Sequence, residues 1–252
     1  MPQAKKRYDM KAMIFAAGMG TRLGAITSDK PKALVEINGK SVLERAVEKL
    51  TGQGFDDIIV NIHHFADMVE NAISQLRDKG YRIAISDERQ RLLETGGGLQ
   101  KAGWFFGKEP FLLYNCDIIT DFNLLELYDH HLKTKGIATL AVMEREDSRF
   151  FLFDEKNTLA GWKNTLTGEV IISRDYSGEL SEAAFCGIHV LDPEVFRFMS
   201  NGMYSLTSFY LEMAGDKKIN AFYYRKGYWA DIGNIDDLRS AEAFLSFESG
   251  SM

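Results

Sequence analysis

The sequence has few cysteines, no surplus of positive charge and no long apolar run. Only Cys116 and Cys186 occur among the 252 residues, too few for a disulfide framework and without metal-ligand spacing, so we expect both thiols to be reduced and structural. The formal net charge of −6 provides no basic footprint for nucleic acid. No stretch approaches the roughly 18 consecutive apolar residues of a membrane-spanning helix. These absences argue against nucleic-acid binding, membrane insertion and redox chemistry.

The first residues lack the apolar region typical of a signal peptide, and the chain has no obvious linker. Residues 1–9 are basic but have no apolar segment, so we expect a short flexible tail on a cytoplasmic protein. The hydrophobic content of 45% is enough to bury a full core in a chain of this length. No long Pro/Gly/Ser linker, internal repeat or low-complexity segment divides the remainder. The expected organisation is therefore one catalytic domain over residues 10–252.

Alternating helix and strand patterns in the first half predict an α/β fold with a mainly parallel, Rossmann-like sheet and helices on both faces. Ser41 followed by Glu44 is a capping box, which predicts a helix that ends at Gly52. The apolar strand at 111–114 stops at Asn115-Cys116-Asp117, as expected for a central strand that brings an acid to the carboxyl edge of the sheet. The strands predicted in this half cover 11–16, 58–62, 81–86 and 111–114, and further helices are predicted around 69–76 and from the glycines at 96–98.

From about residue 150 the pattern changes to short segments that are broken by turns, such as 158–162, 168–172 and 186–191. We expect them to form a smaller β-rich lobe inserted over the sheet. A last helix is predicted over 235–247. Because ligands of open α/β sheets bind along the carboxyl edge of the strands, the functional residues are expected there.

The loop after the first strand, with the sequence AAGMGTRLGAITSDKPK, has the composition of a phosphate-binding loop. Gly18 and Gly20 lack side chains, so backbone N–H groups can approach an anion closely, and Thr21 adds a hydroxyl donor. The Walker pattern requires Gly-Lys-Ser/Thr, which is missing. The dinucleotide fingerprint requires a third glycine where Leu23 stands. The loop is therefore of a different kind.

The spacing Gly-x-Gly-Thr-Arg followed by Pro31-Lys32 resembles the signature of the sugar-1-phosphate nucleotidyltransferases. Within this family, LETGGG (93–98), FLLYNCD (111–117) and WADIG (229–233) are most similar to the N-acetylmuramate-1-phosphate uridylyltransferases. The resemblance extends from about residue 10 to 247. It implies a GT-A-like nucleotidyltransferase fold and the transfer of a nucleotidyl group from UTP to N-acetylmuramate-1-phosphate, which gives a nucleotide sugar and pyrophosphate.

The resemblance also implies roles for four charged residues. Arg22 would bind the β and γ phosphates, since a planar guanidinium can hold two oxygens of the leaving pyrophosphate. Lys32 would lie near the α-phosphate, and Asp117 and Asp231 would hold Mg²⁺, which prefers hard oxygen ligands. In isolation each is more simply a surface cation or a turn acid. Because all four occur together in the order of the family's motifs, a shared substrate and metal site is favoured over these simpler roles.

The remaining predicted site residues contact the two substrates. No general base is expected, because the attacking phosphate already carries negative charge, and catalysis reduces to positioning and charge neutralisation. Sugar binding is assigned to Gly187, Arg149 and Trp162, with Lys163 as a weaker candidate. Nucleotide binding is assigned to the backbone around the loop and to the segment that precedes the glycine-opened helix: Ala16, Ala17, Gly18, Gly20, Thr21, Glu88, Glu94, Thr95 and Gly96.

Three other functions remain open from the sequence. The first is a GTP-dependent guanylyltransferase for mannose- or heptose-1-phosphate. The second is a non-catalytic regulatory subunit of the same fold, which the presence of Arg22, Lys32, Asp117 and Asp231 disfavours. The third is a dinucleotide-dependent oxidoreductase, which the missing third glycine disfavours. The expected partners are a nucleoside triphosphate and a sugar-1-phosphate, with the protein a monomer or a small homo-oligomer.

Overall fold

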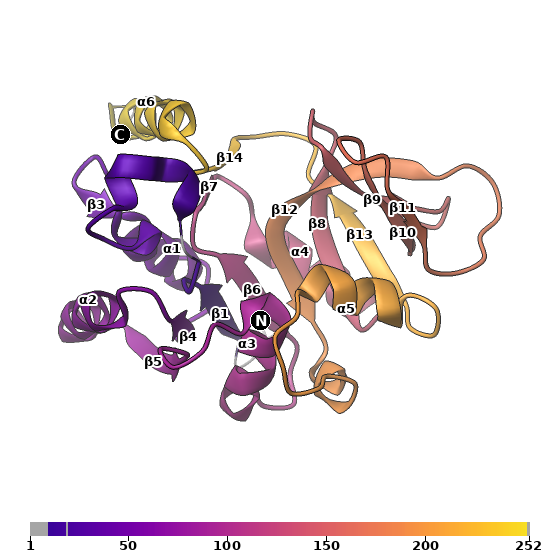
Figure 1. Cartoon of the computed structure of the whole chain (residues 1–252), viewed down its shortest axis with the longest axis horizontal. Coiled ribbons are helices and arrows are strands. Elements are labelled where there is room, and N and C mark those ends of the chain that lie inside the picture. The colour runs from indigo at the N-terminus through magenta and orange to yellow at the C-terminus, as the bar shows by residue number, and fades with distance from the viewer. Residues whose placement is uncertain (1–9, 19, 251–252) are drawn as a thin grey trace, which may run out of the picture.

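The computed structural model describes residues 10–18 and 20–250 (Figure 1), so the predicted tail at 1–9 lies outside the described residues. Within them, the chain forms a ten-stranded sheet. Its strands are β1 (Lys11–Phe15), β4 (Asp57–Ile62), β5 (Arg82–Asp87), β6 (Phe111–Asn115), β8 (Ala138–Met143), β9 (Arg149–Phe153), β10 (Leu159–Asn164), β11 (Val170–Ile172), β12 (Ser181–Leu191) and β13 (Ile219–Tyr223). Two small antiparallel sheets pair β2 (Glu36–Ile37) with β3 (Lys40–Ser41), and β7 (Ile118–Thr120) with β14 (Trp229–Asp231).

The strands that the first half contributes to the main sheet are parallel, as predicted. The sheet order is β11-β10-β9-β12-β6-β1-β4-β5, with β8 attached to β12 and β13 to β8. β6, β1, β4 and β5 run parallel to one another. Their carboxyl ends therefore meet at one edge, and the loops after β1 and β6 both begin there.

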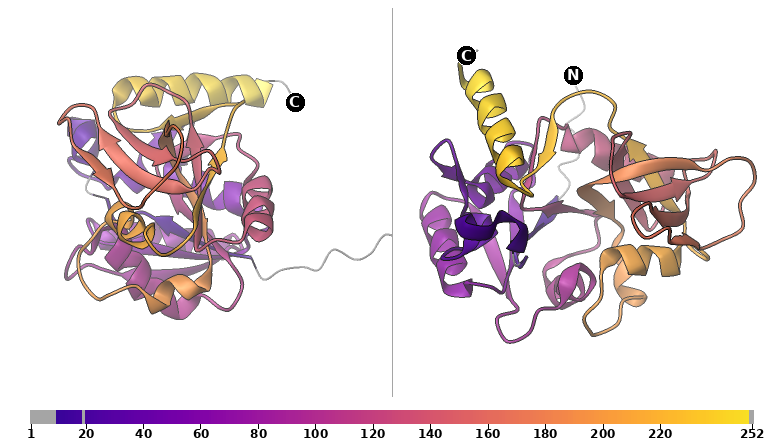
Figure 2. Two further views of the ribbon diagram at one scale, coloured as in Figure 1. Left: turned by 90° about the vertical axis from the view of Figure 1, so that its right-hand side faces the viewer. Right: turned by 45° about the horizontal axis from the view of Figure 1, so that its top comes forward.

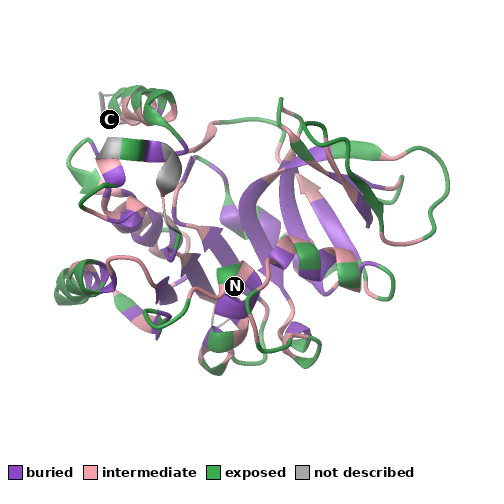
Figure 3. Cartoon of the chain, viewed as in Figure 1, coloured by how far each residue is buried: buried purple, intermediate pink, exposed green. Residues whose placement is uncertain are grey.

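Helices cover both faces of the sheet, which confirms the predicted α/β architecture (Figures 1 and 3). Ala12 and Ile14 of β1 pack with one core cluster and Met13 with the other, because successive strand residues point to opposite faces. The helices on the first face are α1 (Val42–Thr51), α2 (Ala66–Asp78) and α4 (Leu124–Thr134), and those on the second are α3 (Glu94–Ala102) and α5 (Leu206–Met213). None of the helices in the described residues is long and apolar enough to cross a membrane.

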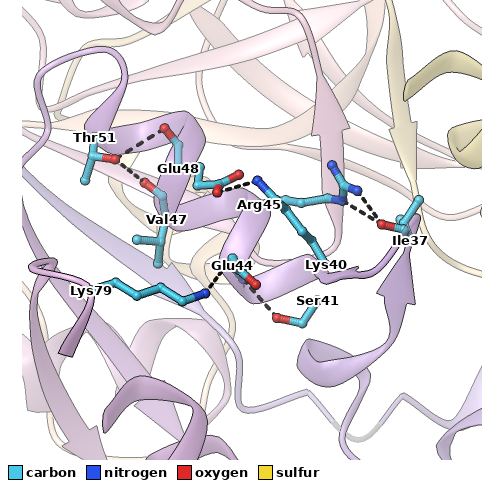
Figure 4. A network of polar contacts seen from close by, with 9 residues as sticks. All are labelled: Ile37, Lys40, Ser41, Glu44, Arg45, Val47, Glu48, Thr51 and Lys79. Atoms are coloured by element: carbon cyan, nitrogen blue, oxygen red, sulfur yellow. Dashed lines mark hydrogen bonds and ion pairs between the residues drawn. The ribbon is translucent and has the colours of Figure 1, made fainter. Parts of the chain in front are cut away.

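The start of α1 shows the predicted helix cap (Figure 4). Ser41 Oγ accepts a hydrogen bond from the Glu44 N–H at 3.1 Å, which satisfies one of the backbone donors left unpaired at a helix start. The Glu44 carboxylate accepts from Lys79 Nζ at 2.6 Å. The Arg45 guanidinium donates to the carbonyl oxygen of Ile37. The contacts of Ser41 and Ile37 fasten α1 to the small β2–β3 hairpin, and the Glu44–Lys79 contact joins α1 to the end of α2.

The predicted β-rich lobe extends the main sheet instead of lying over it. β12 is 11 residues long and has two sets of neighbours. Its carboxyl half, from Ile188 to Leu191, pairs with β6, and its amino half, from Ser181 to Ala183, pairs with β9. Because one long strand takes part in both regions, the lobe continues the main sheet beyond the carboxyl end of β6.

The last helix, α6 (Ile235–Gly250), agrees with the predicted helix and lies across the amino-terminal part of the molecule (Figures 1 and 2). The ring of Phe244 stacks on Tyr228 with centroids 3.8 Å apart. Asn38 Nδ2, in the β2–β3 hairpin, donates to the carbonyl oxygen of Glu242 at 3.1 Å. The helix therefore holds the segment that leads into β14 against the first half of the chain.

Candidate active site

A cavity of about 370 Å³ lies at the carboxyl edge of the parallel strands. The end of β1, the 3₁₀ turn η2 (Lys32–Leu34), the start of α3 and the residues after β6 contribute to its wall. Of the predicted site residues, it is lined by Ala16, Ala17, Gly18, Lys32, Glu94, Thr95 and Asp117. The structure thus brings together residues that are up to 101 positions apart in the sequence, as expected for ligand-binding residues at the carboxyl edge of the sheet.

Gly20 allows the loop after β1 to pass close to Lys32. Its φ of +65° lies in the left-handed region that favours glycine. A Cβ atom at Gly20 would lie 3.0 Å from the Lys32 Cβ. The Thr27 hydroxyl donates to the Gly20 carbonyl oxygen at 2.9 Å and so closes the turn η1 (Thr21–Thr27). The side chains of Thr21 and Arg22 lie outside the described part of the structure, so their roles stay predictions.

Lys32 and Asp117 form an ion pair at the cavity wall. Lys32 Nζ donates to Asp117 Oδ2, and the two side chains are 14% and 24% exposed. Lys32 comes from η2 and Asp117 from the turn between β6 and β7. Partial burial strengthens the attraction between the two charges, since they are only partly screened by water. The pair places one positive and one negative charge where the glycine loop would present phosphates.

Asp231 is brought next to Asp117 by the small β7–β14 sheet. Asp231 is paired with Ile118 across the two strands. The Ile232 N–H donates to the Asp117 carbonyl oxygen at 2.9 Å, and Trp229 Nε1 donates to the Cys186 carbonyl oxygen at 2.8 Å. Asp231 therefore lies on the strand beside β7, and Asp117, 114 positions earlier in the sequence, immediately precedes β7.

The donor set fits Mg²⁺ bound together with phosphate. Asp117 and Asp231 supply hard carboxylate oxygens, and Mg²⁺ is commonly held by one or two carboxylates plus substrate phosphates and water. The Lys32 ammonium on Asp117 shows that this carboxylate already attracts a cation. Among the described residues, no group of three or more His, Cys, Asp or Glu side chains gathers into a self-sufficient metal site. A metal at this place would therefore depend on oxygen ligands from the substrate.

Asn61 is a site residue that the sequence reasoning missed. It is 2% exposed, near the carboxyl end of β4. Its Oδ1 accepts from the Ala16 N–H and its Nδ2 donates to Glu88 Oε1, both at 2.8 Å. Asn61 therefore fixes the first residue of the phosphate loop. The sequence offered one sign of this role, because Asn61 is the one polar residue in the apolar run 58–62 and stands at the end of the strand where ligands bind.

Glu88 lies behind the cavity wall and is 1% exposed. Besides the bond from Asn61, its Oε2 accepts from the Leu93 N–H at 3.3 Å. The chain Ala16–Asn61–Glu88–Leu93 links the loop after β1 to the segment before α3. Glu88 therefore holds Asn61 and the segment before α3 in place, and its predicted contact with the nucleotide stays a prediction.

The buried Glu88 carboxyl should make stability depend on pH. Burial raises its pKa above the ordinary value of 4.5, and the hydrogen bonds from Asn61 and Leu93 oppose this shift. The folded chain thus keeps the proton to higher pH than the unfolded chain, so the stabilisation is complete below pH 4.5 and is lost as the pH rises through the raised folded pKa.

We therefore expect the free energy of unfolding of the wild type, relative to that of Glu88→Gln, to fall as the pH rises above 4.5. Urea unfolding at a series of pH values measures this difference, and contributions from other carboxyls cancel in it. A difference that stays constant with pH would contradict the raised pKa of Glu88.

The glycines at the start of α3 are required by close packing. The Gly96 N–H donates to the Tyr204 carbonyl oxygen at 2.8 Å, and a Cβ atom at Gly96 would lie 2.4 Å from the Tyr204 ring. At Gly97 the Cβ atom would lie 1.9 Å from the Gly202 carbonyl oxygen. The Gly96 N–H is thus already bonded within the chain, and Gly96 shapes the cavity through packing.

Glu94 and Thr95 line the cavity itself. Glu94 has a φ of +57°, a left-handed conformation that is uncommon for a residue with a side chain and that occurs often at functional sites. Thr95 Oγ1 accepts from the Leu206 N–H at 2.8 Å. The start of α3 is therefore attached to the start of α5, which forms part of a second groove.

This second groove, of about 870 Å³, adjoins the first cavity through Ser205, which lines both. Arg149, Trp162 and Asp231 line it, so the three predicted residues meet in one place. Lys163 instead forms an ion pair with Glu182 at 2.6 Å.

Gly187 lies behind Asn115, a residue of the first cavity, and has a φ of +73°. A Cβ atom there would lie 2.9 Å from Asn115 Nδ2. Glycine at this position therefore leaves space for the Asn115 side chain at the cavity wall.

Comparison with known proteins places this site in context. A family model described as "Nucleotidyl transferase" matches residues 11–247. An N-acetylmuramate alpha-1-phosphate uridylyltransferase of Caulobacter vibrioides is 33% identical over 248 residues, covering 93% of this chain and 96% of the relative. One from Neisseria meningitidis serogroup B is 27% identical, covering 93% and 97%. A mannose-1-phosphate guanyltransferase of Yarrowia lipolytica is 28% identical, covering 92% of this chain and 62% of the relative.

Solved structures share the fold. HddC from Yersinia pseudotuberculosis, complexed with GMP-PN, superposes with a TM-score of 0.76 at 21% identity and covers 93% of this chain and 99% of that chain. A putative glucose-1-phosphate thymidylyltransferase from Bacillus anthracis superposes with a TM-score of 0.74 at 20% identity, covering 93% and 94%.

Proposed function

Because this chain belongs to the nucleotidyl transferase family, we propose that it transfers a uridylyl group from UTP to N-acetylmuramate-1-phosphate and releases pyrophosphate. The observation that carries the proposal is the convergence of the glycine loop, Lys32 and Asp117 on one cavity that adjoins a second groove at Ser205. Two adjoining spaces suit a reaction between two substrates. The relatives from Caulobacter and Neisseria, which align over nearly their whole length, support the choice of uridine and of the sugar.

In the proposed reaction a phosphate oxygen of the sugar-1-phosphate attacks the α-phosphorus of UTP. The new bond forms to this phosphorus, and the bond to the oxygen bridging to the β-phosphorus breaks, so pyrophosphate leaves with that oxygen. The attacking phosphate is already an anion and requires no general base. The chain must therefore align the two phosphates and neutralise their charges.

Lys32, Asp117 and Asp231 supply this charge control. We propose that Lys32 exchanges its contact with Asp117 for the phosphates when substrate binds, and that Asp117 and Asp231 hold Mg²⁺. When bound, Mg²⁺ would neutralise charge between the phosphates. Arg22 remains our proposed ligand of the leaving pyrophosphate. The Asn61–Glu88 chain keeps the loop after β1 in place for this arrangement.

The nucleotide base is assigned to the wall made by Leu92, Glu94 and Thr95. This wall is attached to the segments on either side of it by the bond between Thr95 and the Leu206 N–H and by the glycine packing against Tyr204. A wall fixed in this way should discriminate by size. We further propose that residues 10–252 act as one domain, in the cytoplasm, as a monomer or small homo-oligomer.

A guanylyltransferase is the second candidate, and the similarity to the mannose-1-phosphate guanyltransferase of Yarrowia lipolytica favours it. A non-catalytic subunit is disfavoured, because Lys32 and Asp117 form an ion pair at the first cavity and Asp231 lines the adjoining groove.

We expect UTP to exceed GTP by at least about tenfold in kcat/KM with N-acetylmuramate-1-phosphate. The larger guanine would either clash with the cavity wall or leave buried polar groups unpaired, at about 1–3 kcal/mol each. Pyrophosphate release should be measured with UTP, GTP, CTP and dTTP at saturating Mg²⁺, each with N-acetylmuramate-1-phosphate, mannose-1-phosphate and a heptose-1-phosphate. Preference for GTP with either neutral sugar would replace the uridylyl proposal by the guanylyl one.

A further inference from the structure

One wall of the second groove is formed by one face of β9, β10 and β11, which carries both apolar and polar side chains. Phe151 is paired with Trp162 and Trp162 with Ile171, so the three side chains lie in a row across three strands on one face of the sheet. Two positions along the strands, Arg149 is paired with Asn164 on the same face. The apolar row could pack against the face of a ring, and the guanidinium at its end could bind an anionic substituent of that ring.

The charges that line this groove are one cation and three acids. The acids are Asp147, Glu169 and Asp231, and the cation is Arg149. The Asp147 carboxylate already has partners within the chain. It forms an ion pair with Arg145 at 2.5 Å and accepts hydrogen bonds from the backbone N–H groups of Ser148 and Arg149 at 2.7 and 3.2 Å. Asp147 is thus not a free partner for the Arg149 guanidinium.

The neighbouring cation, Arg145, also has partners within the chain. Its guanidinium lies 4.1 Å from the centre of the Trp229 ring and donates to the Phe185 carbonyl oxygen at 3.2 and 3.3 Å. Over the described residues, by contrast, the Arg149 guanidinium makes no side-chain hydrogen bond or ion pair. An arginine left unpaired in a ligand-sized groove, with its planar fork exposed, is suited to bind a carboxylate from outside the chain.

We infer that Arg149 binds the carboxylate of the sugar substrate and makes the groove selective for an anionic sugar. The inference rests on the proposed function. N-acetylmuramate differs from N-acetylglucosamine by a lactyl ether that ends in a carboxylate, whereas mannose and glucose carry no such group. Arg149 lies on β9 and Asp231 on β14, so Arg149 would bind the carboxylate end of the sugar, while Asp231 would reach the phosphate end only through the proposed Mg²⁺. Trp162 lies on β10, the strand between β9 and β11, and its ring provides an apolar surface for one face of the sugar.

The test compares two sugar phosphates that differ only in the lactyl group. With UTP, the wild type should use N-acetylmuramate-1-phosphate with a kcat/KM about 10- to 100-fold higher than N-acetylglucosamine-1-phosphate. Arg149→Gln should remove most of this preference, by lowering kcat/KM for the first substrate and leaving that for the second within about twofold. The loss should lie mainly in KM, because the carboxylate is far from the reacting bond. Lys156→Gln, which removes an exposed cation from the β9–β10 turn, should leave both substrates unchanged.

The retained activity on N-acetylglucosamine-1-phosphate also shows that the variant is folded. An equal loss with both substrates, an unchanged preference, or a wild type that uses both equally would overturn the role of Arg149. Wild-type inactivity on both with UTP would instead overturn the proposed function. In that case the role of Arg149 can still be tested by calorimetry, which measures the affinity of the wild type and of Arg149→Gln for each sugar phosphate. The inference is supported if the substitution lowers only the affinity for N-acetylmuramate-1-phosphate. It is overturned if the substitution leaves both affinities unchanged or lowers them equally.

Discussion

Asp117→Asn should lower the turnover rate by about 10²- to 10³-fold, the loss typical when one electrostatic stabiliser of a transition state is removed. The substitution keeps the size of the side chain and removes a full negative charge from the carboxylate that meets Lys32 and adjoins β14. Magnesium affinity should fall with it, because the neutral amide is a weaker ligand than a carboxylate. Pyrophosphate release measured over a range of Mg²⁺ concentrations should show a higher half-saturating concentration and only partial recovery at high metal.

Asp129→Asn is the matched control, since it makes the same chemical change at an exposed position on α4. It should leave both the turnover rate and the Mg²⁺ dependence unchanged. If Asp117→Asn retained wild-type turnover and metal dependence, Asp117 would be a turn acid at the end of a strand and the proposed metal site would be wrong.

Lys32→Met should reduce kcat/KM by about 10²- to 10³-fold. Methionine keeps most of the length of the side chain but removes the ammonium that pairs with Asp117 in the cavity wall. With the phosphates bound, that charge would no longer offset the negative charge at the reacting phosphorus. The effect should be larger on kcat than on nucleotide binding if Lys32 stabilises the transition state more than the bound substrate.

Lys30→Met removes a cation from the same loop and provides the control for net charge. It should change kcat/KM by less than about twofold, as most surface charges do when they are removed. Equal effects of the two substitutions would mean that the loop acts through its general positive charge, without a specific role for Lys32.

Local patterns in the sequence were sufficient to predict the elements that build the carboxyl edge. The apolar runs of β1 and β6 were identifiable because a central parallel strand is buried on both faces. The cap at Ser41 was identifiable because its partner, Glu44, is only three residues away. Lys32 and Asp117 followed from family motifs, and the structure shows them in contact.

Contacts between distant segments could not be predicted in the same way. Asn61 joins Ala16 and Glu88 across strands, and nothing in its local sequence indicates either partner. The glycines at the start of α3 suggested a loop that binds the base, but their sequence did not indicate that Gly96 packs against the ring of Tyr204, more than 100 residues later. The unpaired state of Arg149 likewise depends on how neighbouring side chains pair in three dimensions.

The most direct test of uridylyl transfer follows the α-phosphorus of UTP. The protein should be incubated with Mg²⁺, UTP labelled at the α-phosphorus and unlabelled N-acetylmuramate-1-phosphate, and the products separated and identified by mass. Uridylyl transfer predicts that the label appears in UDP-N-acetylmuramate, with one equivalent of unlabelled pyrophosphate, and that omission of the sugar phosphate stops both. Label that remains in UTP, or that appears in UMP whether or not the sugar phosphate is present, would contradict it.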